Sequence, residues 1–372
     1  MVRRVGGWRL EPRGEVPRGL VIAVSLGAFV AALVVTGFIF LAYGHNPITA
    51  YRDIFASTLG SFRGFAEVLR KTIPLLLAGV GLVLALRAQF WNIGAEGQIL
   101  AGATAASGVA LFVPLPGPWL LIAMFLAGFL GGALWGLAPA LLKVQLGVSE
   151  IITTLMLNYV ALYFVQYLIY GPWKGLSTRG MPLTDTFVPA AWLPTVSGTR
   201  LHWPTLLLGV VLAFAVAFLL SKTTLGFETK VLGQSPKAAR YAGIDFTRTT
   251  ALLVLVAAGA AGLAGAGEVA GIHHRLIEPT DLSLGYGYTA IIVALLARGN
   301  PIAAIFTALM LGWVAATGDV VRVTLRMPAE ITGVISGLIL FFLLASEPLL
   351  RYRLRRDPTS RTEGLEPLRE GH

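Results

Sequence analysis

The sequence of 372 residues contains no cysteine, and only 13% of its residues are charged. Without cysteine the chain has no disulfide framework, no thiolate metal site and no thiol nucleophile. Soluble domains are about 25% charged, so a water-soluble enzyme of this length would lack polar residues for its surface. Disorder requires low hydrophobicity, and with 56% hydrophobic residues the chain is not predicted to be disordered.

Sequence signatures of catalysis are also absent. The chain has no G-x-x-x-x-G-K-[ST] phosphate loop, no H-E-x-x-H zinc motif and no G-x-S-x-G nucleophile motif. The adjacent His273 and His274 would diverge on a helix, and no acidic or cysteine partner lies at ligand spacing. We therefore expect no catalytic site, no metal and no cofactor, and the chain is not predicted to be an enzyme.

Long apolar runs are the main feature that the chain does have. A spanning helix needs about 20 apolar residues to cross about 30 Å of hydrocarbon. The uncharged run 19–43 meets this length and exceeds the apolar part of a signal peptide. Further candidate spans are 73–86, 93–113, 119–142, 151–170, 205–220, 250–272, 286–297, 302–317 and 331–346. The predicted fold class is all-α, a polytopic transmembrane helical bundle of about ten spans.

The basic residues predict the orientation of these spans. With the N-terminus inside, 19 Lys and Arg residues fall in inside segments and 10 in outside segments, as the positive-inside rule requires. Both termini are therefore expected to be cytoplasmic, and the net charge of +10 is an orientation signal rather than a nucleic-acid footprint.

The same assignment predicts the domain organisation. A basic cytoplasmic arm (1–18) precedes a transmembrane domain (19–346), and a basic cytoplasmic tail (347–372) follows it. The transmembrane domain contains a basic cytoplasmic loop, 221–249, and a proline-rich, irregular external loop, 171–204. The tail is expected to be polar and loosely ordered beyond residue 357.

Polar residues interrupt two apolar runs in the stretch RAQFWNIGAEGQIL, residues 87–100. Asn92 and Glu96 alternate with Gly94 and Gly97. A helix break at membrane depth must face protein or a water-filled cavity, and an acidic residue there suggests a functional site. The alternative is an interfacial hairpin in which Glu96 lies at a helix N-terminus and is favoured by the dipole. The sequence leaves both open.

Other polar and aromatic residues of the runs also have two interpretations. Phe90 and Trp91 fit an aromatic belt as well as a stacking platform. Asn158 would be costly facing lipid, so it forms an interhelical hydrogen bond or lines a path. The glycines of GFLGGALWG, residues 128–136, have the small-x-x-x-small spacing of close helix contact, within the chain or between subunits.

The cytoplasmic loop contains a predicted short helix, 236–242. Pro236 suits the first helical turn and Gly243 follows the end. The small residues Ala238 and Ala239 suit a helix that docks into a groove on another protein.

Four stretches of the sequence resemble the membrane permease subunits of ABC importers, in the group of branched-chain amino acid and simple-sugar permeases. The resemblance covers residues 20–345 and is greatest to the nucleoside (purine) uptake branch. The stretches are FWNIGAEGQILAGA (90–103), SEIITTLMLNYVALYFVQYLIYG (149–171), TLGFETKVLGQSPKAARYAGI (224–244) and EPTDLSLGYGYTAIIVALLARGNPIAAIF (278–306).

The resemblance implies an inner-membrane assembly of two permeases, two cytoplasmic ATPase subunits and an external substrate-binding lipoprotein. Two related permeases are expected to pair as a heterodimer. The family also has two related halves, which makes 283–291 the counterpart of 92–100. The residues that the resemblance assigns to ATPase coupling are Gly233, Pro236, Ala238, Ala239 and Gly243.

The expected function is therefore passage of a nucleoside, with ATP hydrolysed by separate subunits. The candidate path residues are Phe90, Trp91, Asn92, Gly94, Glu96, Gly97, Asn158, Tyr159, Tyr286 and Tyr288. Simple sugars and branched-chain amino acids are alternative substrates. A proton-coupled secondary transporter with Glu96 or Glu268 as its proton site is a further alternative.

Overall fold

The computed structural model of the chain describes residues 4, 5, 8–13, 17–178, 180–328 and 330–356. The part of the tail that was expected to be loosely ordered, beyond residue 357, lies outside these residues. The described chain separates into two compact units, residues 1–54 with 321–372 and residues 55–320.

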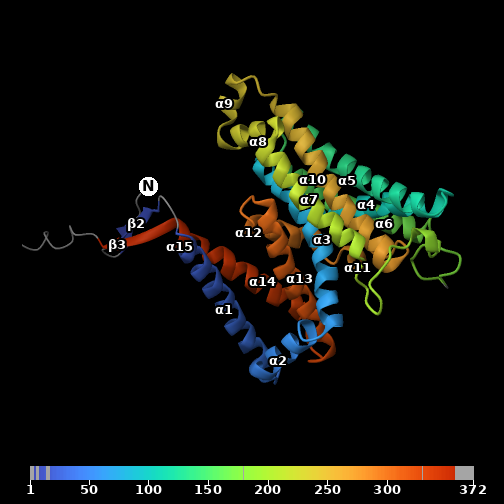
Figure 1. The fold of residues 1–372 in the computed structure, drawn as a ribbon, viewed down its shortest axis with the longest axis horizontal. Coiled ribbons are helices and arrows are strands. Elements are labelled where there is room, and N and C mark those ends of the chain that lie inside the picture. The colour runs from blue at the N-terminus through green and yellow to red at the C-terminus, as the bar shows by residue number, and fades with distance from the viewer. Residues whose placement is uncertain (1–3, 6–7, 14–16, 179, 329, 357–372) are drawn as a thin grey trace, which may run out of the picture. The chain divides into compact units, whose positions relative to one another are not determined.

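The described chain is mainly helical, which confirms the predicted fold class, and each predicted span overlaps a helix (Figure 1). The long helices are α1 (Arg18–Ala42), α3 (Phe62–Arg87), α4 (Ala95–Phe112), α5 (Pro118–Leu146), α6 (Glu150–Tyr170), α7 (Trp203–Lys222), α10 (Phe246–Glu268), α13 (Pro301–Val323) and α14 (Glu330–Ala345). The shorter ones are α2 (Pro47–Thr58), α8 (Thr224–Gln234), α9 (Pro236–Tyr241), α11 (Pro279–Ser283), α12 (Tyr286–Leu296) and α15 (Glu347–Arg351), with a 3-10 turn η1 (Pro189–Ala191) and a π-helical turn η2 (Val269–His273).

The first unit joins the two ends of the chain. Strands β1 (Arg4–Val5), β2 (Trp8–Pro12) and β3 (Tyr352–Arg356) form an antiparallel sheet in which Trp8 pairs with Arg356 and Pro12 with Tyr352. Because β2 belongs to the predicted arm and β3 to the predicted tail, both ends lie on the same side of this unit. That both ends are cytoplasmic stays a prediction.

The second unit is built on a core of closely packed glycines on α4, α5 and α10. A Cβ atom added to Gly262 would lie 2.2 Å from the carbonyl oxygen of Gly128, and one added to Gly132 would lie 2.4 Å from that of Ala258. A Cβ atom on Gly102 would lie 2.3 Å from the Cα of Gly262. The helix contact predicted from the spacing of residues 128–136 is thus confirmed, and it lies within the chain.

The number of membrane spans is not settled by helix length. Six described helices are long and apolar enough to cross a membrane, or seven if the pair α1 and α2, bent by 111°, is counted as one span. Helix α12 has 11 residues and is therefore about 16 Å long, half of the hydrocarbon thickness. The count of ten spans stays a prediction.

Helix α3 begins at Phe62, well before the predicted run, and is almost wholly buried. As a result, Arg70 and Lys71, which were assigned to an external segment, lie inside the helix and are buried. Arg70 pairs with Glu67. The ammonium group of Lys71 lies 2.5 Å from a carboxylate oxygen of Asp319. The predicted run began at residue 73 because hydropathy counts Arg70 and Lys71 as unpaired charges.

Candidate functional site

The chain between α3 and α4, residues 88–94, runs along α6 in a non-helical conformation. The amide of Trp91 lies 3.5 Å from Oε1 of Glu150, and the amide of Ile93 donates to Oγ1 of Thr154 at 3.2 Å. The residues of α6 that contact this segment follow one another along the helix from Glu150 to Asn158, a distance of about 12 Å. The helix break therefore lies inside the bundle, where side chains of α6 satisfy backbone groups that lipid would leave unpaired.

Asn92 holds this break in place rather than facing a cavity. Its amide exchanges hydrogen bonds of 2.9 and 3.0 Å with the side chain of Gln98, and its Oδ1 accepts from the amide of Gly94 at 3.0 Å. Asn92 and Gln98 are both buried. Gly94 and Gly97 let α6 approach, because a Cβ atom on either would lie 3.0 Å from an atom of Thr154 or Asn158.

Glu96 lies between the N-termini of two helices. It is in the first turn of α4, whose N-cap is Gly94, and it faces the start of α12, whose N-cap is Gly285. Its Oε1 accepts from the hydroxyl of Ser283 at 2.5 Å, and its Oε2 accepts from the amide of Gly287 at 2.7 Å. A carboxylate is favoured at both helix ends by their dipoles. The segments expected to be counterparts thus start helices at corresponding glycines and meet through Glu96.

Asn158 connects the helix break to a cavity. Its Nδ2 donates to the carbonyl of Ile93 at 2.9 Å and lies 3.3 Å from the hydroxyl of Tyr288, while its Oδ1 accepts from the amide of Gly97 at 2.8 Å. The interhelical hydrogen bond and the cavity-lining position therefore occur together, although the sequence had presented them as alternatives.

The cavity has a volume of about 250 Å3 and lies between α4, α6, α11 and α12. Four candidate path residues meet in its wall. The wall consists of Glu96, Leu100, Asn158, Tyr159, Leu162, Pro279, Thr280, Ser283, Gly285 and Tyr288. Ser283 and Thr280 were missed in the sequence, and only the correspondence of 283–291 with 92–100 could have indicated Ser283.

The other aromatic candidates do not reach this cavity. Phe90 is fully buried, with the ammonium group of Lys143 5.1 Å from its ring centroid, a cation–π contact. Trp91 is partly exposed. Tyr286 is buried, and its hydroxyl has no hydrogen-bond partner among the described residues.

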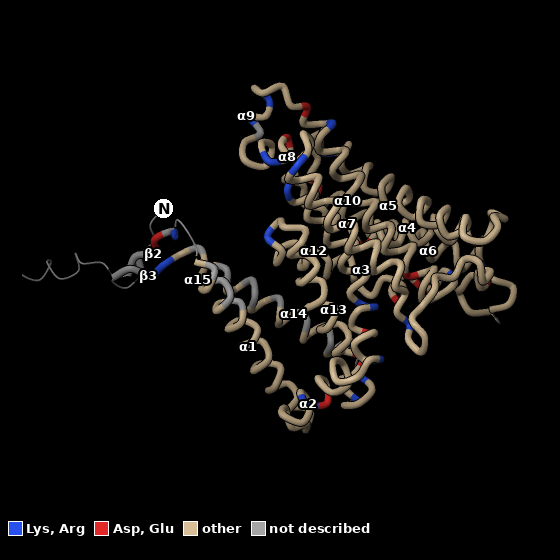
Figure 2. Tube along the Cα trace, in the orientation of Figure 1, with Lys and Arg blue, Asp and Glu red and all other residues tan. Residues whose placement is uncertain are grey.

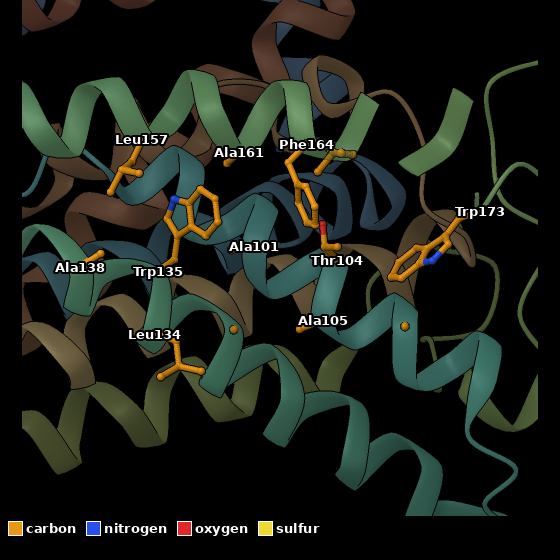
Figure 3. Close-up of a pocket in the computed structure, with 13 residues that line it drawn as sticks. Ala101, Thr104, Ala105, Leu134, Trp135, Ala138, Leu157, Ala161, Phe164 and Trp173 are labelled. Atoms are coloured by element: carbon orange, nitrogen blue, oxygen red, sulfur yellow. The ribbon is translucent and has the colours of Figure 1, made fainter. Parts of the chain in front are cut away.

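A larger cavity of about 480 Å3 lies between α4, α5 and α6 (Figure 3). Its wall is mainly apolar. Of its polar groups, the Thr104 hydroxyl donates to the carbonyl of Leu100 in its own helix, and the indole N–H of Trp135 is buried without a described partner. The indole N–H of Trp173 also lies in this wall. Two donors in an otherwise apolar wall orient a polar solute less well than the hydroxyl and amide groups of the smaller cavity, which is therefore the better candidate site.

The predicted coupling residues lie at the end of the second unit where α3 ends. Gln89 donates from Nε2 to the carbonyl of Gly233 at 3.2 Å, and Lys143 donates to the carbonyl of Gln89 at 2.9 Å. Lys143 also lies 2.6 Å from Glu150. Figure 2 shows Lys and Arg residues gathered around α8 and α9, whereas the long helices carry little charge. The end of α8 is thus hydrogen-bonded to the segment that leads to the cavity.

Helix α9 confirms the predicted short helix, and Gly243 follows it with φ +73°. Ala239 is buried within the chain, so the exposed face of α9 presents other residues, Lys237, Arg240 and Tyr241. The helix begins at Pro236, and the side-chain surroundings of Pro236 and Ala238 lie outside the described part of the structure.

The loop 171–204, which was predicted to be external, is irregular apart from η1, as its prolines predicted. Hydrogen bonds from the side chain and amide of Ser177 lower the pKa of Asp185 in this loop. At its end, burial lowers the pKa of His202 to about 3. Its Nδ1 lies 2.7 Å from the hydroxyl of Thr205, so a neutral imidazole holds the start of α7.

Comparison with known proteins finds a match to the family described as branched-chain amino acid transport system / permease component, over residues 64–344. A glucose ABC transporter permease of Haloferax volcanii is 38% identical over 358 residues, 93% of each chain. A nucleoside ABC transporter permease of Lactococcus lactis is 34% identical over 87% of this chain and 90% of that one. A guanosine ABC transporter permease of Bacillus subtilis is 28% identical over 87% of this chain and 93% of that one.

Proposed function

The chain belongs to the family of permease components of branched-chain amino acid transport systems, and on this premise we propose that it carries nucleosides across the inner membrane. Its relatives are permease subunits of ABC transporters, so the chain is a multi-pass ABC importer permease rather than an enzyme. Its ATPase subunits, a second related permease and an external binding lipoprotein are the partners that this proposal requires.

The polar wall of the cavity, which combines hydroxyl groups with the single carboxylate of Glu96, carries the substrate assignment. Both carboxylate oxygens of Glu96 are engaged by Ser283 and Gly287, and the wall has no Lys or Arg residue among its described members. A zwitterionic amino acid would bury a carboxylate there without a cation, which is costly. The hydroxyl groups of Tyr159, Tyr288 and Thr280 instead suit ribose hydroxyls and base edges.

Sugars remain the second candidate, because the same hydroxyl groups suit them and a relative with 38% identity is named a glucose permease. A cavity of about 250 Å3 is smaller than typical sites for drug-sized ligands, about 300–1,000 Å3. This volume suits a small solute held by few contacts. Weak binding is expected in a permease that receives its solute from a separate binding protein.

The contacts at the end of α8 support a route for ATP-driven movement. An ATPase that pulls on α9 would move α8, whose Gly233 carbonyl holds Gln89. Gln89 begins the segment that reaches Ile93, and Ile93 is hydrogen-bonded to Asn158 in the cavity wall. Movement of the docking helices would thereby reach the cavity through backbone and amide contacts.

A substitution on the exposed face of α9 tests the coupling. Tyr241 is 94% exposed, so Tyr241→Asp leaves the packing of the chain intact while placing a charge at the proposed dock. We expect ATP hydrolysis by the complete transporter to continue while uptake of radiolabelled guanosine falls at least about tenfold. Ala239→Arg is expected to uncouple as well, through displacement of the buried side of α9.

Leu176, 98% exposed in the external loop, provides the matched control as Leu176→Asp. Uptake that survives Tyr241→Asp and Ala239→Arg unchanged would show that α9 is not the dock. Competition of guanosine uptake by unlabelled guanosine, glucose and leucine tests the substrate, and competition by leucine alone would refute the nucleoside assignment.

A further inference from the structure

Helix α6 carries a row of exposed tyrosines. Tyr159, Tyr163 and Tyr167 follow one another at a spacing of four residues, which places them on one face of the helix. They are 52%, 65% and 65% exposed, and Tyr170 at the end of the helix continues the row. The repeated spacing is visible in the sequence. The exposure of the tyrosine side chains is not, because the sequence does not show which face of the helix lacks neighbours.

The exposed faces of α5 and α7 differ in composition. Their outward residues in the middle of each helix are aliphatic or phenylalanine, as expected for contact with lipid. They are Leu126, Leu130 and Leu134 on α5, and Leu207, Val211, Phe214 and Phe218 on α7. Trp119 and Trp203 lie at the first residues of these helices, where an aromatic belt is expected.

A belt does not explain the tyrosines of α6. Tyr159 and Tyr170 are separated by about 16 Å along the helix axis, about half of the hydrocarbon thickness. In the described structure the hydroxyl groups of Tyr163 and Tyr167 have no hydrogen-bond partner. An unpaired hydroxyl deep in hydrocarbon is costly, so this face is expected to contact water.

The row is continuous with the cavity. Tyr159 is a member of both, and Leu162, on the next turn of the helix, also lines the cavity. Further along α6, Gln166 donates to Oε1 of Glu278 at 2.5 Å, which joins α6 to the segment preceding α11. The row of tyrosines therefore begins at the cavity wall with Tyr159 and continues along α6 toward the end of the helix.

We propose that Tyr163 and Tyr167 line a water-filled route that continues from the cavity and that their rings stack against the ring of the transported solute. The occupant is a neutral, ring-bearing solute, because a tyrosine ring offers a flat apolar face beside a hydroxyl and base–aromatic stacking tolerates different bases. The identity of the solute rests on the proposed function, whereas the contact of this face of α6 with water does not.

The absence of native cysteine permits a direct test of water contact. In the assembled transporter, Tyr163→Cys and Tyr167→Cys are treated with a charged, membrane-impermeant methanethiosulfonate reagent. Leu130→Cys and Val211→Cys are matched controls, because these residues are 54% and 53% exposed on α5 and α7, whose outward residues are apolar. Since the reagent requires a thiolate in water, we expect the α6 positions to react at least about tenfold faster.

Two outcomes would overturn the route. Equal, slow reaction at all four positions would assign the α6 face to lipid. Slow reaction combined with rapid disulfide cross-linking to a cysteine in the second permease would make the face a dry subunit contact. Neither outcome depends on which solute is carried, so a transporter that moves glucose instead of guanosine would refute the substrate proposal and leave this result standing.

Uptake of radiolabelled guanosine tests the stacking. Tyr163→Phe keeps the ring and is expected to retain uptake within about twofold, whereas Tyr163→Leu is expected to lower it at least about tenfold, since a leucine has no flat face. Leu130→Ala on α5 controls for loss of volume on an exposed face. Full uptake in the double variant Tyr163→Leu/Tyr167→Leu would refute stacking, even if both positions prove to be in water.

Discussion

Replacement of Glu96 by glutamine separates a positioning role from a proton-carrying role. Glutamine keeps the shape, accepts from the amide of Gly287 through its Oε1 and can donate from its Nε2 to the oxygen of Ser283. In the variant the single hydroxyl proton of Ser283 can turn from residue 96 to the carbonyl of Pro279, which lies 2.8 Å away, so that the hydroxyl oxygen accepts this bond. Hydrogen bonds to a charged group contribute about 1.5–3 kcal/mol and neutral ones about 0.5–1.5 kcal/mol.

Two such bonds are weakened in the Glu96→Gln variant, while the desolvation of a buried charge is relieved. The net loss of unfolding free energy is therefore expected to be about 1–2 kcal/mol. In Glu96→Ala the buried amide of Gly287 loses its acceptor and α12 loses the carboxylate at its N-terminus. That variant is expected to lose about 2–4 kcal/mol and to assemble poorly.

The assays are thermal unfolding of the purified transporter and uptake of radiolabelled guanosine between pH 5.5 and 8. For Glu96→Gln we expect a lower melting temperature, uptake within about threefold of the unmodified transporter per assembled complex, and an unchanged pH profile. Glu278→Gln, which changes a carboxylate outside the cavity wall, is the control. Abolished uptake in a fully assembled Glu96→Gln transporter would show that the carboxylate itself takes part in transport, as in the proton-coupled alternative.

Two further predictions concern packing and pH. Gly262→Ala is expected to lower the unfolding free energy by about 2 kcal/mol or more, because its Cβ would lie 2.2 Å from the Gly128 carbonyl and overpacking costs about 1–3 kcal/mol. Gly27→Ala is the control and is expected to be neutral or stabilising, because no atom lies within 4 Å of its added Cβ. Equal melting temperatures for the two variants would contradict the packing. Burial lowers the pKa of His202 from 6.5 to about 3, so unfolding takes up a proton below pH 6.5 and stability falls as the pH falls from 6.5 toward 3. His202→Gln is expected to reduce that fall in melting temperature between pH 7.5 and 4.5, and an unchanged fall would assign it to other groups.

Features that depend on local sequence could be predicted, and features that depend on distant partners could not. The apolar runs predicted the helices, and Pro236 with Gly243 predicted α9, because these signals act within one turn. By contrast, the carboxylate of Glu96 meets an amide 191 residues away, and Lys71 meets Asp319. Hydropathy treats each charge as unpaired, which explains why it placed Lys71 outside the helix.

The helix break shows why charge is a poor guide to the proposed substrate site in this chain. Glu96 is the most conspicuous residue of the segment, yet its oxygens are engaged by a hydroxyl and by the start of α12. Asn92 is likewise engaged by Gln98. The groups left available to a solute in the cavity wall are uncharged hydroxyls, such as that of Tyr288.

The helix break, whose polar side chains are hydrogen-bonded within the chain, lies next to hydroxyl groups of the cavity wall, and this arrangement has a consequence for selectivity. In the proposed site the carboxylate of Glu96 is the one fixed charge among the described wall residues, and it is already hydrogen-bonded to Ser283 and Gly287. An anionic solute would therefore lose water without compensation, whereas a neutral polyhydroxylated ring exchanges water for hydroxyl contacts at little cost. The proposed site is therefore expected to disfavour anions. It is also expected to release a neutral solute readily, because the hydroxyl groups of the wall form no charge-assisted bond with such a solute.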